Sequence, residues 1–394
     1  MLKSVQHRHQ HPGIKSVQES QEDAVLLLKD GTIFRGVGFG ADRVVEGEVV
    51  FNTGMVGYPE SLTDPSYYGQ ILVQTWPLVG NYGVPSSKIA DGFGVPLHFE
   101  SKEIQVRGYV VSELAKVPSH WSSSHHLEDW FAESGLPGIQ GIDTRELTKK
   151  LRTQGTMLGI LAKGRDIDPQ ALSRRLGSIS DPNREDLVRP VSVSKTVDYN
   201  LQGTPKVALV DCGVKYGIVR NLLARGARVL QMPYDTPADE ILSHSPAGVV
   251  ISNGPGDPKM CRATIESARG LLETDVPMLG ICLGTQILAL AGGGDTYKLK
   301  FGHRAQNHPC VELKTGRVYL TTQNHGYTVD QASLKDFATS FVNLNDKTVE
   351  GISHRRKAVV GVQFHPEASP GPYETGFLFD QFLERARSFQ GKTK

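Results

Sequence analysis

Apolar runs and amphipathic stretches alternate along the second half of the chain. Short apolar runs bounded by turn residues occur at 207–210, 228–230, 248–252 and 359–364, and a helical pattern over 218–224 separates the first two. Runs of this length are typical of strands that are buried on both faces. Strands that alternate with helices predict an α/β domain whose mostly parallel sheet is flanked by helices. In such sheets, ligands bind at the carboxyl ends of the strands.

The first half has a different rhythm, because glycine and proline interrupt its apolar runs more often. Residues 24–34 predict a hairpin whose two strands flank the turn Lys29-Asp-Gly31. Short strands are also expected at 49–51 and 71–73, with a shaped loop at 54–67 between them. The pattern predicts a β-rich α+β domain, smaller than the second one.

Two helices are predicted in the first half, at 125–133 and 143–152. In the second of them, Asp143 is the expected N-cap and Glu146 its capping-box partner. The chain becomes polar and loses its period from 178 to 204. The predicted division is a disordered leader at 1–21, the β-rich domain at 22–195, a linker at 196–205 and the α/β domain at 206–394, whose last helix is expected at 374–387.

Charge and cysteine content narrow the classes of protein to consider. The 394 residues include 43 Lys and Arg against 42 Asp and Glu, a formal net charge of +1. Such a chain is not expected to bind nucleic acid or an anionic membrane. Its apolar runs are too short to span a bilayer, and its four cysteines are too scattered for a disulfide framework. The predicted compartment is the cytoplasm, with the mitochondrion as the alternative because the leader has no acidic residue before Glu19.

The motif Gly280-Ile-Cys-Leu-Gly284 stands where an apolar run meets a helical pattern that ends at Gly292-Gly-Gly294. A nucleophile between a strand and a helix sits in a strained turn that tolerates only small neighbours. The amino terminus of the following helix favours the thiolate form of a cysteine. Cys282 is therefore the candidate nucleophile, and the alternative is a buried, inert cysteine.

A thiolate that attacks a carbonyl carbon needs a base, a group that orients the base, and N–H donors for the oxyanion. His365 at the end of a predicted strand is the candidate base, and Glu367 is the candidate orienting group. The candidate oxyanion donors are the backbone N–H groups of Gly254, Gly256 and Leu283. Each turn alone could be an ordinary polar turn. Their joint occurrence at strand ends of one domain favours a catalytic site.

No metal site is predicted. His303, His308 and His325 match no standard zinc spacing, so ordinary core or surface histidines are expected. The segment Gln323-Asn-His-Gly-Tyr327 is expected to be a loop, either one that approaches a ligand or an ordinary turn.

Four motifs of the second half together resemble the class I, or triad-type, glutamine amidotransferases. They are Ser252-Asn-Gly-Pro-Gly-Asp-Pro258, Gly280-Ile-Cys-Leu-Gly284, Gln323-Asn-His-Gly326 and Phe364-His-Pro-Glu367. In the first half, Phe51-Asn-Thr-Gly-Met-Val-Gly-Tyr-Pro-Glu60, Leu62-Thr-Asp-Pro-Ser-Tyr67, Gly80-Asn-Tyr-Gly83 and Gly141-Ile-Asp-Thr-Arg145 are similar to the small subunit, or glutaminase region, of carbamoyl phosphate synthetases, especially the eukaryotic type. The resemblance covers residues 22–388. It departs at Thr285, where the family usually has His, and at Gly302-His-Arg-Ala305, where it usually has Gly-Asn-Arg-Gly.

This resemblance implies hydrolysis of L-glutamine by a Cys282–His365–Glu367 triad through a glutamyl thioester. The ammonia would pass to a large synthetase subunit or domain that makes carbamoyl phosphate for arginine or pyrimidine synthesis. The implied glutamine-binding residues are Ser66, Gly254, Gly256, Leu283, Gln286, Asn324, Gly326 and Tyr327. No cofactor is implied in this chain, because the partner uses ATP and Mg²⁺, and the sequence contains no Gly-x4-Gly-Lys-Ser/Thr loop.

Two alternatives remain, one a different enzyme and one a protein without catalytic activity. One is a different class I amidotransferase, which would feed ammonia to a nucleotide or aromatic-acid synthase; the motifs of the first half argue against it. The other is a catalytically silent regulatory subunit, which the intact Cys282, His365 and Glu367 disfavour.

Overall fold

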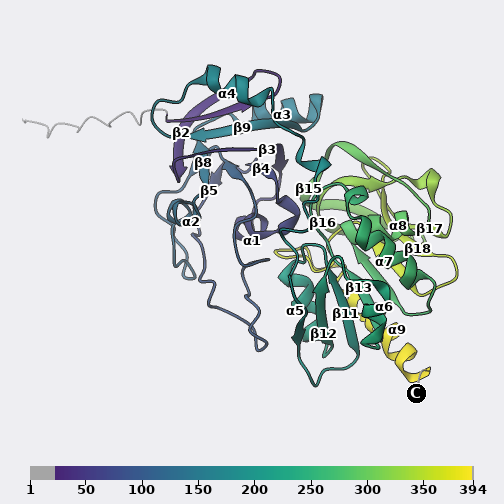
Figure 1. Cartoon of the computed structure of the whole chain (residues 1–394). Helices are drawn as coiled ribbons and strands as arrows, with labels where there is room; N and C mark the ends of the chain where they lie inside the picture. The colour runs from purple at the N-terminus through teal and green to yellow at the C-terminus, as the bar shows by residue number, and fades with distance from the viewer. Residues whose placement is uncertain (1–22, 393–394) are drawn as a thin grey trace, which may run out of the picture.

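The structure is a computed structural model that describes residues 23–392, and the predicted leader at 1–21 lies outside them. Figure 1 shows two bodies side by side, a β-barrel from the amino-terminal half and a larger sheet with helices from the carboxy-terminal half. Backbone hydrogen bonds join them, from the Thr53 nitrogen to the Arg304 oxygen and from the Thr156 nitrogen to the Lys300 oxygen. Among the described residues, the helices are all too short or too polar to cross a membrane.

Seven strands close the amino-terminal barrel. Around the barrel they are β1 (Ala24–Leu28), β2 (Ile33–Gly40), β8 (Pro137–Gln140), β6 (Gly108–Val110), β4 (Gln70–Gln74), β3 (Arg43–Asn52) and β9 (Met157–Lys163). The predicted hairpin is confirmed, since β1 and β2 pair antiparallel around a turn in which Gly31 has a φ of +88°. Closure was not predicted, because it depends on pairing between β1 and β9, which are far apart in the sequence.

The helices of the barrel domain are short. They are α1 (Tyr58–Thr63), α2 (Leu127–Glu133), α3 (Thr144–Gln154) and α4 (Pro169–Leu176), with 3₁₀ turns at Pro65–Tyr67 and Pro182–Arg184 and a small ladder of β5 (Leu78–Val79) and β7 (Glu113–Leu114). The side chain of Asp143 accepts a hydrogen bond from the Glu146 nitrogen, so the predicted N-cap of α3 is confirmed.

The segment predicted as a shaped loop at 54–67 is instead mostly helical, so that prediction was wrong. Gly57 has a φ of +79° immediately before α1, and Pro59 lies in the first turn of the helix. Proline is tolerated at this position because its missing N–H would have no partner in the helix. Six residues are too few to show a helical period, so the glycines and prolines dominated the pattern.

The carboxy-terminal sheet is mixed rather than mostly parallel. Its order is β10 (Val197–Tyr199), β12 (Arg228–Pro233), β11 (Lys206–Asp211), β13 (Gly248–Ile251), β14 (Met278–Ile281), β19 (Val359–Val362), β18 (Val349–His354), β17 (Phe337–Asn343), β15 (Thr296–Glu312) and β16 (Val318–Val329). The strands from β12 to β19 are parallel, whereas β10 and the strands from β18 to β16 are antiparallel. The prediction therefore holds for the centre of the sheet only.

Helices cover both faces of the parallel centre. Ala208 and Val210 of β11 pack with α6 (Ala238–Ser243), α7 (Arg262–Leu272) and α8 (Leu283–Ala291) on one face. Val207 and Leu209 pack with α5 (Tyr216–Ala224) and α9 (Phe377–Lys392) on the other. Because successive side chains of a strand point to opposite faces, one apolar run fills both halves of the core.

Two segments that were not predicted as strands belong to this sheet. β10 lies inside the predicted linker at 196–205 and pairs antiparallel with β12. Residues 323–327 lie within β16, so the prediction of a loop there was wrong. The sequence pattern did not indicate this strand, because several of its buried side chains are polar. Pairing with β15 places these side chains in a buried site between the two domains.

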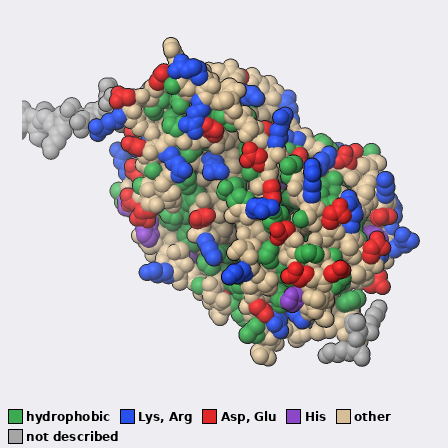
Figure 2. All heavy atoms as spheres, viewed as in Figure 1, with side chains coloured by type: hydrophobic (Ala, Val, Ile, Leu, Met, Phe, Trp, Pro, Cys, Tyr) green, Lys and Arg blue, Asp and Glu red, His purple; other side chains and the backbone are tan. Residues whose placement is uncertain are grey.

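Figure 2 shows one face of the molecule, where Lys and Arg side chains are interspersed with Asp and Glu. No broad field of one sign covers this face, in keeping with the net charge of +1.

Candidate active site

The elbow around Cys282 has the geometry that its glycines predict. Cys282 follows β14 directly, precedes α8, and has φ 54° and ψ −104°. A positive φ is strained for a residue with a side chain and persists only where the surroundings enforce it. A Cβ atom on Gly284 would lie 2.1 Å from the Ile251 oxygen, and one on Gly280 would lie 2.7 Å from the backbone of Gly284. Only glycine fits at either position.

His365 and Glu367 lie beside the elbow, both buried. The Nδ1 of His365 is 2.6 Å from the Oε1 of Glu367. The other ring nitrogen, Nε2, is buried and makes no hydrogen bond within the described residues. The Cys282 sulfur is close enough for its charge to act on the pKa of His365. The three predicted catalytic residues are therefore brought together.

Lys215, which the sequence analysis did not single out, completes the charge arrangement. Its Nζ lies 3.0 Å from the Oε1 of Glu367, and both side chains are almost fully buried. Burial and the charge of Lys215 oppose the charged form of His365, but Glu367 and Cys282 outweigh them and raise the pKa of His365 to about 10. Burial likewise opposes a charged Glu367, but Lys215 and His365 lower its pKa to about 2. The pair is thus an imidazolium facing a carboxylate.

Two hydrogen bonds connect residues of the barrel domain to residues of the site. The Asn324 amide donates to Asp64 Oδ2 at 2.9 Å, and the Asn253 amide donates to Ser66 Oγ at 2.9 Å. Asp64 also accepts a hydrogen bond from the Ser66 nitrogen at the start of the 3₁₀ turn. The short helices that replace the predicted loop therefore fix Ser66 against the second domain.

A small pocket lies over the elbow, lined by residues of both domains. Its lining includes Cys282 and every residue implied by the family resemblance, namely Ser66, Gly254, Gly256, Leu283, Gln286, Asn324, Gly326 and Tyr327. Pockets at domain junctions that gather a few polar groups are typical ligand sites. The pocket thus unites the predicted substrate residues, which are spread over the sequence.

Two charged residues that the sequence analysis missed also line this pocket. Arg304 is buried, donates to the Phe301 oxygen at 2.7 Å, and makes no ion pair among the residues that the structure describes. Glu48 is buried and is held by Lys298 at 2.6 Å and by Thr156 at 2.8 Å. One buried cation and one buried anion suit a zwitterionic ligand such as a free amino acid.

The two departures from the family pattern have different surroundings. Thr285 is fully buried and its hydroxyl donates to the oxygens of Gly280 and Val362, so it fastens α8 to the sheet. His303 lies in the antiparallel half of the sheet, next to His325.

The missed residues differ in the signal that the sequence gives for them. Asp64, Asn253 and Arg304 lie within segments that carry the family resemblance, so those segments could have indicated them. Lys215 had no such signal, because its contact with Glu367 joins two distant segments and spacing along the chain does not reveal it.

Comparison with known proteins gives the same two-part organisation. Residues 26–161 match the family described as carbamoyl-phosphate synthase small chain, CPSase domain, and residues 208–385 match glutamine amidotransferase class-I.

Curated relatives extend this similarity over nearly the whole chain. The carbamoyl phosphate synthase small chain of Methanopyrus kandleri is 48% identical over 92% of this chain and 99% of its own length. The arginine-specific small chain of Chaetomium globosum is 46% identical over 94% of this chain and 80% of its own. The small chain of Archaeoglobus fulgidus is 46% identical over 93% of this chain and 99% of its own. The chain therefore belongs to the carbamoyl phosphate synthase small-chain family, with a class I glutamine amidotransferase region in its carboxy-terminal half.

Proposed function

We propose that this chain is the glutaminase component of a glutamine-hydrolysing carbamoyl phosphate synthetase. It hydrolyses L-glutamine and delivers the ammonia to a large synthetase subunit or domain, in arginine or pyrimidine biosynthesis. The observation that carries the proposal is that Cys282, paired with His365 and Glu367, opens onto a pocket lined by all eight implied substrate residues. The match of residues 26–161 favours this function over that of another class I amidotransferase.

In the first half of the reaction, the Cys282 thiolate attacks the side-chain amide carbon of glutamine. The negative charge moves to the amide oxygen, where the backbone N–H groups of Leu283 and Gly254 are the proposed donors. Leu283 is the first residue of α8, so its N–H has no carbonyl partner within the helix. His365 then protonates the departing nitrogen, the C–N bond breaks, and ammonia leaves behind a glutamyl thioester.

In the second half, His365 takes a proton from water, and the resulting hydroxide attacks the thioester carbon. The C–S bond breaks, glutamate is released and the thiolate is restored. Glu367 keeps the ring oriented through both steps, since it holds Nδ1 and leaves Nε2 without another partner among the described residues. None of these steps needs a cofactor, and we assign the use of ATP and Mg²⁺ to the partner. The proposed compartment of the protein is the cytoplasm.

The proposed function is tested by assaying glutamate release from the full chain, alone and with its large synthetase partner. We expect low glutaminase activity alone and a rise of at least about tenfold in the complex, because enzymes that channel a leaking intermediate gain from completing the site only on assembly. Ammonium chloride should replace glutamine for carbamoyl phosphate formation by the complex. A complex that makes carbamoyl phosphate only from ammonia, with no glutamate released, would instead identify the silent regulatory subunit.

Ser66 is expected to contribute to substrate binding from the other domain. Ser66→Ala removes a hydroxyl that lines the pocket and accepts a hydrogen bond from Asn253, so we expect KM for glutamine to rise by about tenfold. Ser122→Ala is the control, because Ser122 belongs to the same domain but lines neither this pocket nor the adjoining cavity beside His365. Unchanged KM and kcat in Ser66→Ala would remove Ser66 from the proposed site.

A further inference from the structure

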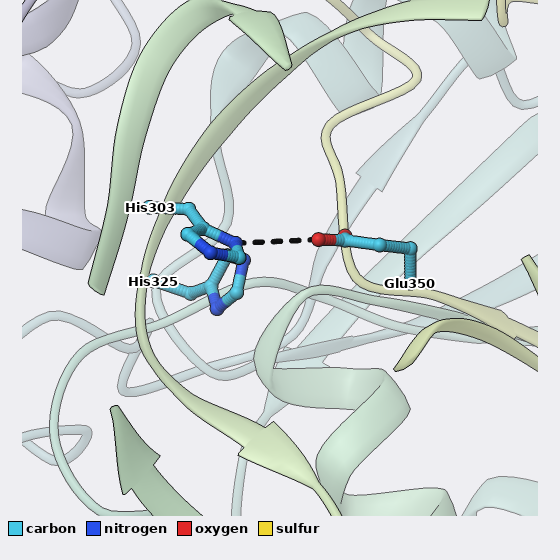
Figure 3. Close-up of side chains that lie close together, drawn as sticks. All are labelled: His303, His325 and Glu350. Atoms are coloured by element: carbon cyan, nitrogen blue, oxygen red, sulfur yellow. Dashed lines mark ion pairs between the residues drawn. The ribbon is translucent and has the colours of Figure 1, made fainter. Parts of the chain in front are cut away.

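A cluster of two histidines and a glutamate lies in the antiparallel half of the large sheet. His303 comes from β15, His325 from β16 and Glu350 from β18, and all three are buried. One potential ligand atom from each lies within 4.8 Å of the other two. Figure 3 shows the two rings beside each other, with the carboxylate of Glu350 directed toward His303. His303 and His325 are direct partners in the ladder, so the strand register itself creates the pair.

Both rings are held by the nitrogen that points away from the cluster. The Nε2 of His303 lies 2.8 Å from Asp346 Oδ2, and the Nδ1 of His325 lies 2.7 Å from the Tyr327 oxygen. Histidines that bind metals usually donate their second N–H to a carboxylate or a backbone carbonyl in this way. The arrangement leaves Nδ1 of His303 and Nε2 of His325 as the inward, ligand-presenting atoms.

Glu350 supplies a buried carboxylate whose hydrogen-bonding capacity is incompletely used. Its Oε1 accepts from the Asn343 amide at 2.9 Å and lies 3.3 Å from Nδ1 of His303. Its Oε2 is buried without a hydrogen-bond partner among the described residues. Such an atom is costly to bury unless something else compensates it. A separation of 3.3 Å is also about that of two ligands around a tetrahedral ion with bonds of about 2.0–2.1 Å.

Gln323 gives the cluster a fourth potential ligand. Its Oε1 lies 3.1 Å from Nε2 of His325, and its amide nitrogen donates to Cys310 and Thr321 on the opposite side. With Nδ1–H of His325 given to the Tyr327 oxygen, two acceptors face each other across this gap. A cation shared between them resolves that mismatch.

We propose that His303, His325 and Glu350 bind one divalent transition-metal ion of the zinc class, with the Gln323 oxygen as the fourth ligand. Two imidazole nitrogens and a carboxylate suit zinc better than magnesium or calcium, which prefer oxygen ligands only. The ion would join β15, β16 and β18 at the wall of the candidate glutamine pocket, which His325 also lines. Linear spacing could not predict the site, because its ligands come from three strands.

The alternative to this proposal is a cluster without metal, in which hydrogen bonds hold the same residues. His303 would be an imidazolium clamped between Asp346 and Glu350, and the Gln323 amide would be turned to donate to His325. Added metal would then have no effect on this part of the sheet.

The test is a Zn²⁺ titration of the full chain, followed by competition with a chromophoric chelator and by thermal unfolding. It is made in a background with Cys282→Ala and with His7, His9 and His11 replaced by Asn, since the catalytic thiol and the leader histidines are competing ligands. We expect one Zn²⁺ per chain and a rise in Tm of several degrees at saturation. Co²⁺ in place of Zn²⁺ should give d–d absorption bands without a thiolate charge-transfer band.

Three variants in the same background make the assignment. His303→Asn, which restores the residue usual in the family, and Glu350→Gln, which keeps the shape of the side chain, should each weaken Zn²⁺ binding by at least about 100-fold. His308→Gln is the control, because its ring lies 4.7 Å from that of His303 but is not one of the three ligands. Absence of Zn²⁺ and Co²⁺ binding in the background protein overturns the proposal. So does binding that His303→Asn and Glu350→Gln leave unchanged while circular dichroism shows them folded.

Discussion

Cys282→Ala is expected to lower glutamine-dependent carbamoyl phosphate formation by the complex by at least about 10⁴-fold. The substitution removes the only sulfur at the elbow and leaves the partner's ATP chemistry untouched. Synthesis from ammonium chloride should stay within about twofold of wild type. His365→Ala should show the same split, because without a general acid the departing nitrogen is not protonated.

The control for this experiment is Cys212→Ala, since Cys212 is equally buried in the same domain but does not line the pocket. Both activities of Cys212→Ala should stay near those of wild type. Glutamine-dependent activity of Cys282→Ala within tenfold of wild type would contradict its assignment as nucleophile. Loss of both activities in an assembled complex would show damage to coupling instead.

Glu367→Gln is expected to have the second largest effect, on activity and on stability together. The amide cannot stabilise the imidazolium of His365, so we expect kcat for glutamine hydrolysis to fall by about 10²–10⁴-fold. The same change leaves Lys215 buried without its carboxylate, 3.0 Å away in the wild type. Breaking a buried ion pair by removing one partner costs about 3–5 kcal/mol of unfolding free energy. Urea unfolding measures the loss.

A double variant separates the two effects. Lys215→Met with Glu367→Gln removes both charges, so its unfolding free energy should exceed that of Glu367→Gln alone, while its activity stays low. A double variant no more stable than the single one would show that the unpaired lysine is not the cause.

The stability difference between wild type and Glu367→Gln should depend on pH. The pKa of Glu367 is lowered to about 2, so its contribution is present above the ordinary value of 4.5 and is lost as pH falls through about 2. The pKa of His365 is raised to about 10, so its contribution is complete below the ordinary value of 6.5 and is lost as pH rises through about 10. The difference should therefore be larger at pH 6 than at pH 10.

Elements whose conformation depends on residues close to them in the sequence were predicted correctly. Gly280 and Gly284 predicted the elbow because only glycine fits so near Ile251 and α8, and Asp143 predicted the start of α3 by its capping bond. The proposed triad and the eight implied substrate residues came from short motifs of the family resemblance, and the structure brings these motifs together around one pocket. Each of these predictions rests on a few residues that are neighbours in the sequence.

The remainder depends on pairings between distant segments. The barrel closes through β1 and β9, and β16 becomes a strand only against β15. Lys215 becomes part of the site only because α5 brings it beside Glu367, and its sequence neighbours do not indicate a buried ion pair. Short polar strands and single buried charges of this kind are set by tertiary contacts, so a pattern along the chain does not contain them.

The most direct test of the account is capture of the glutamyl thioester. The complex is mixed with radiolabelled L-glutamine and ATP, quenched in acid within milliseconds, and digested. The account predicts label on the peptide that contains Cys282, released by hydroxylamine as the γ-hydroxamate of glutamate and absent from Cys282→Ala. Turnover of glutamine with no label on that peptide at any quench time, or with the label on another residue, would contradict it.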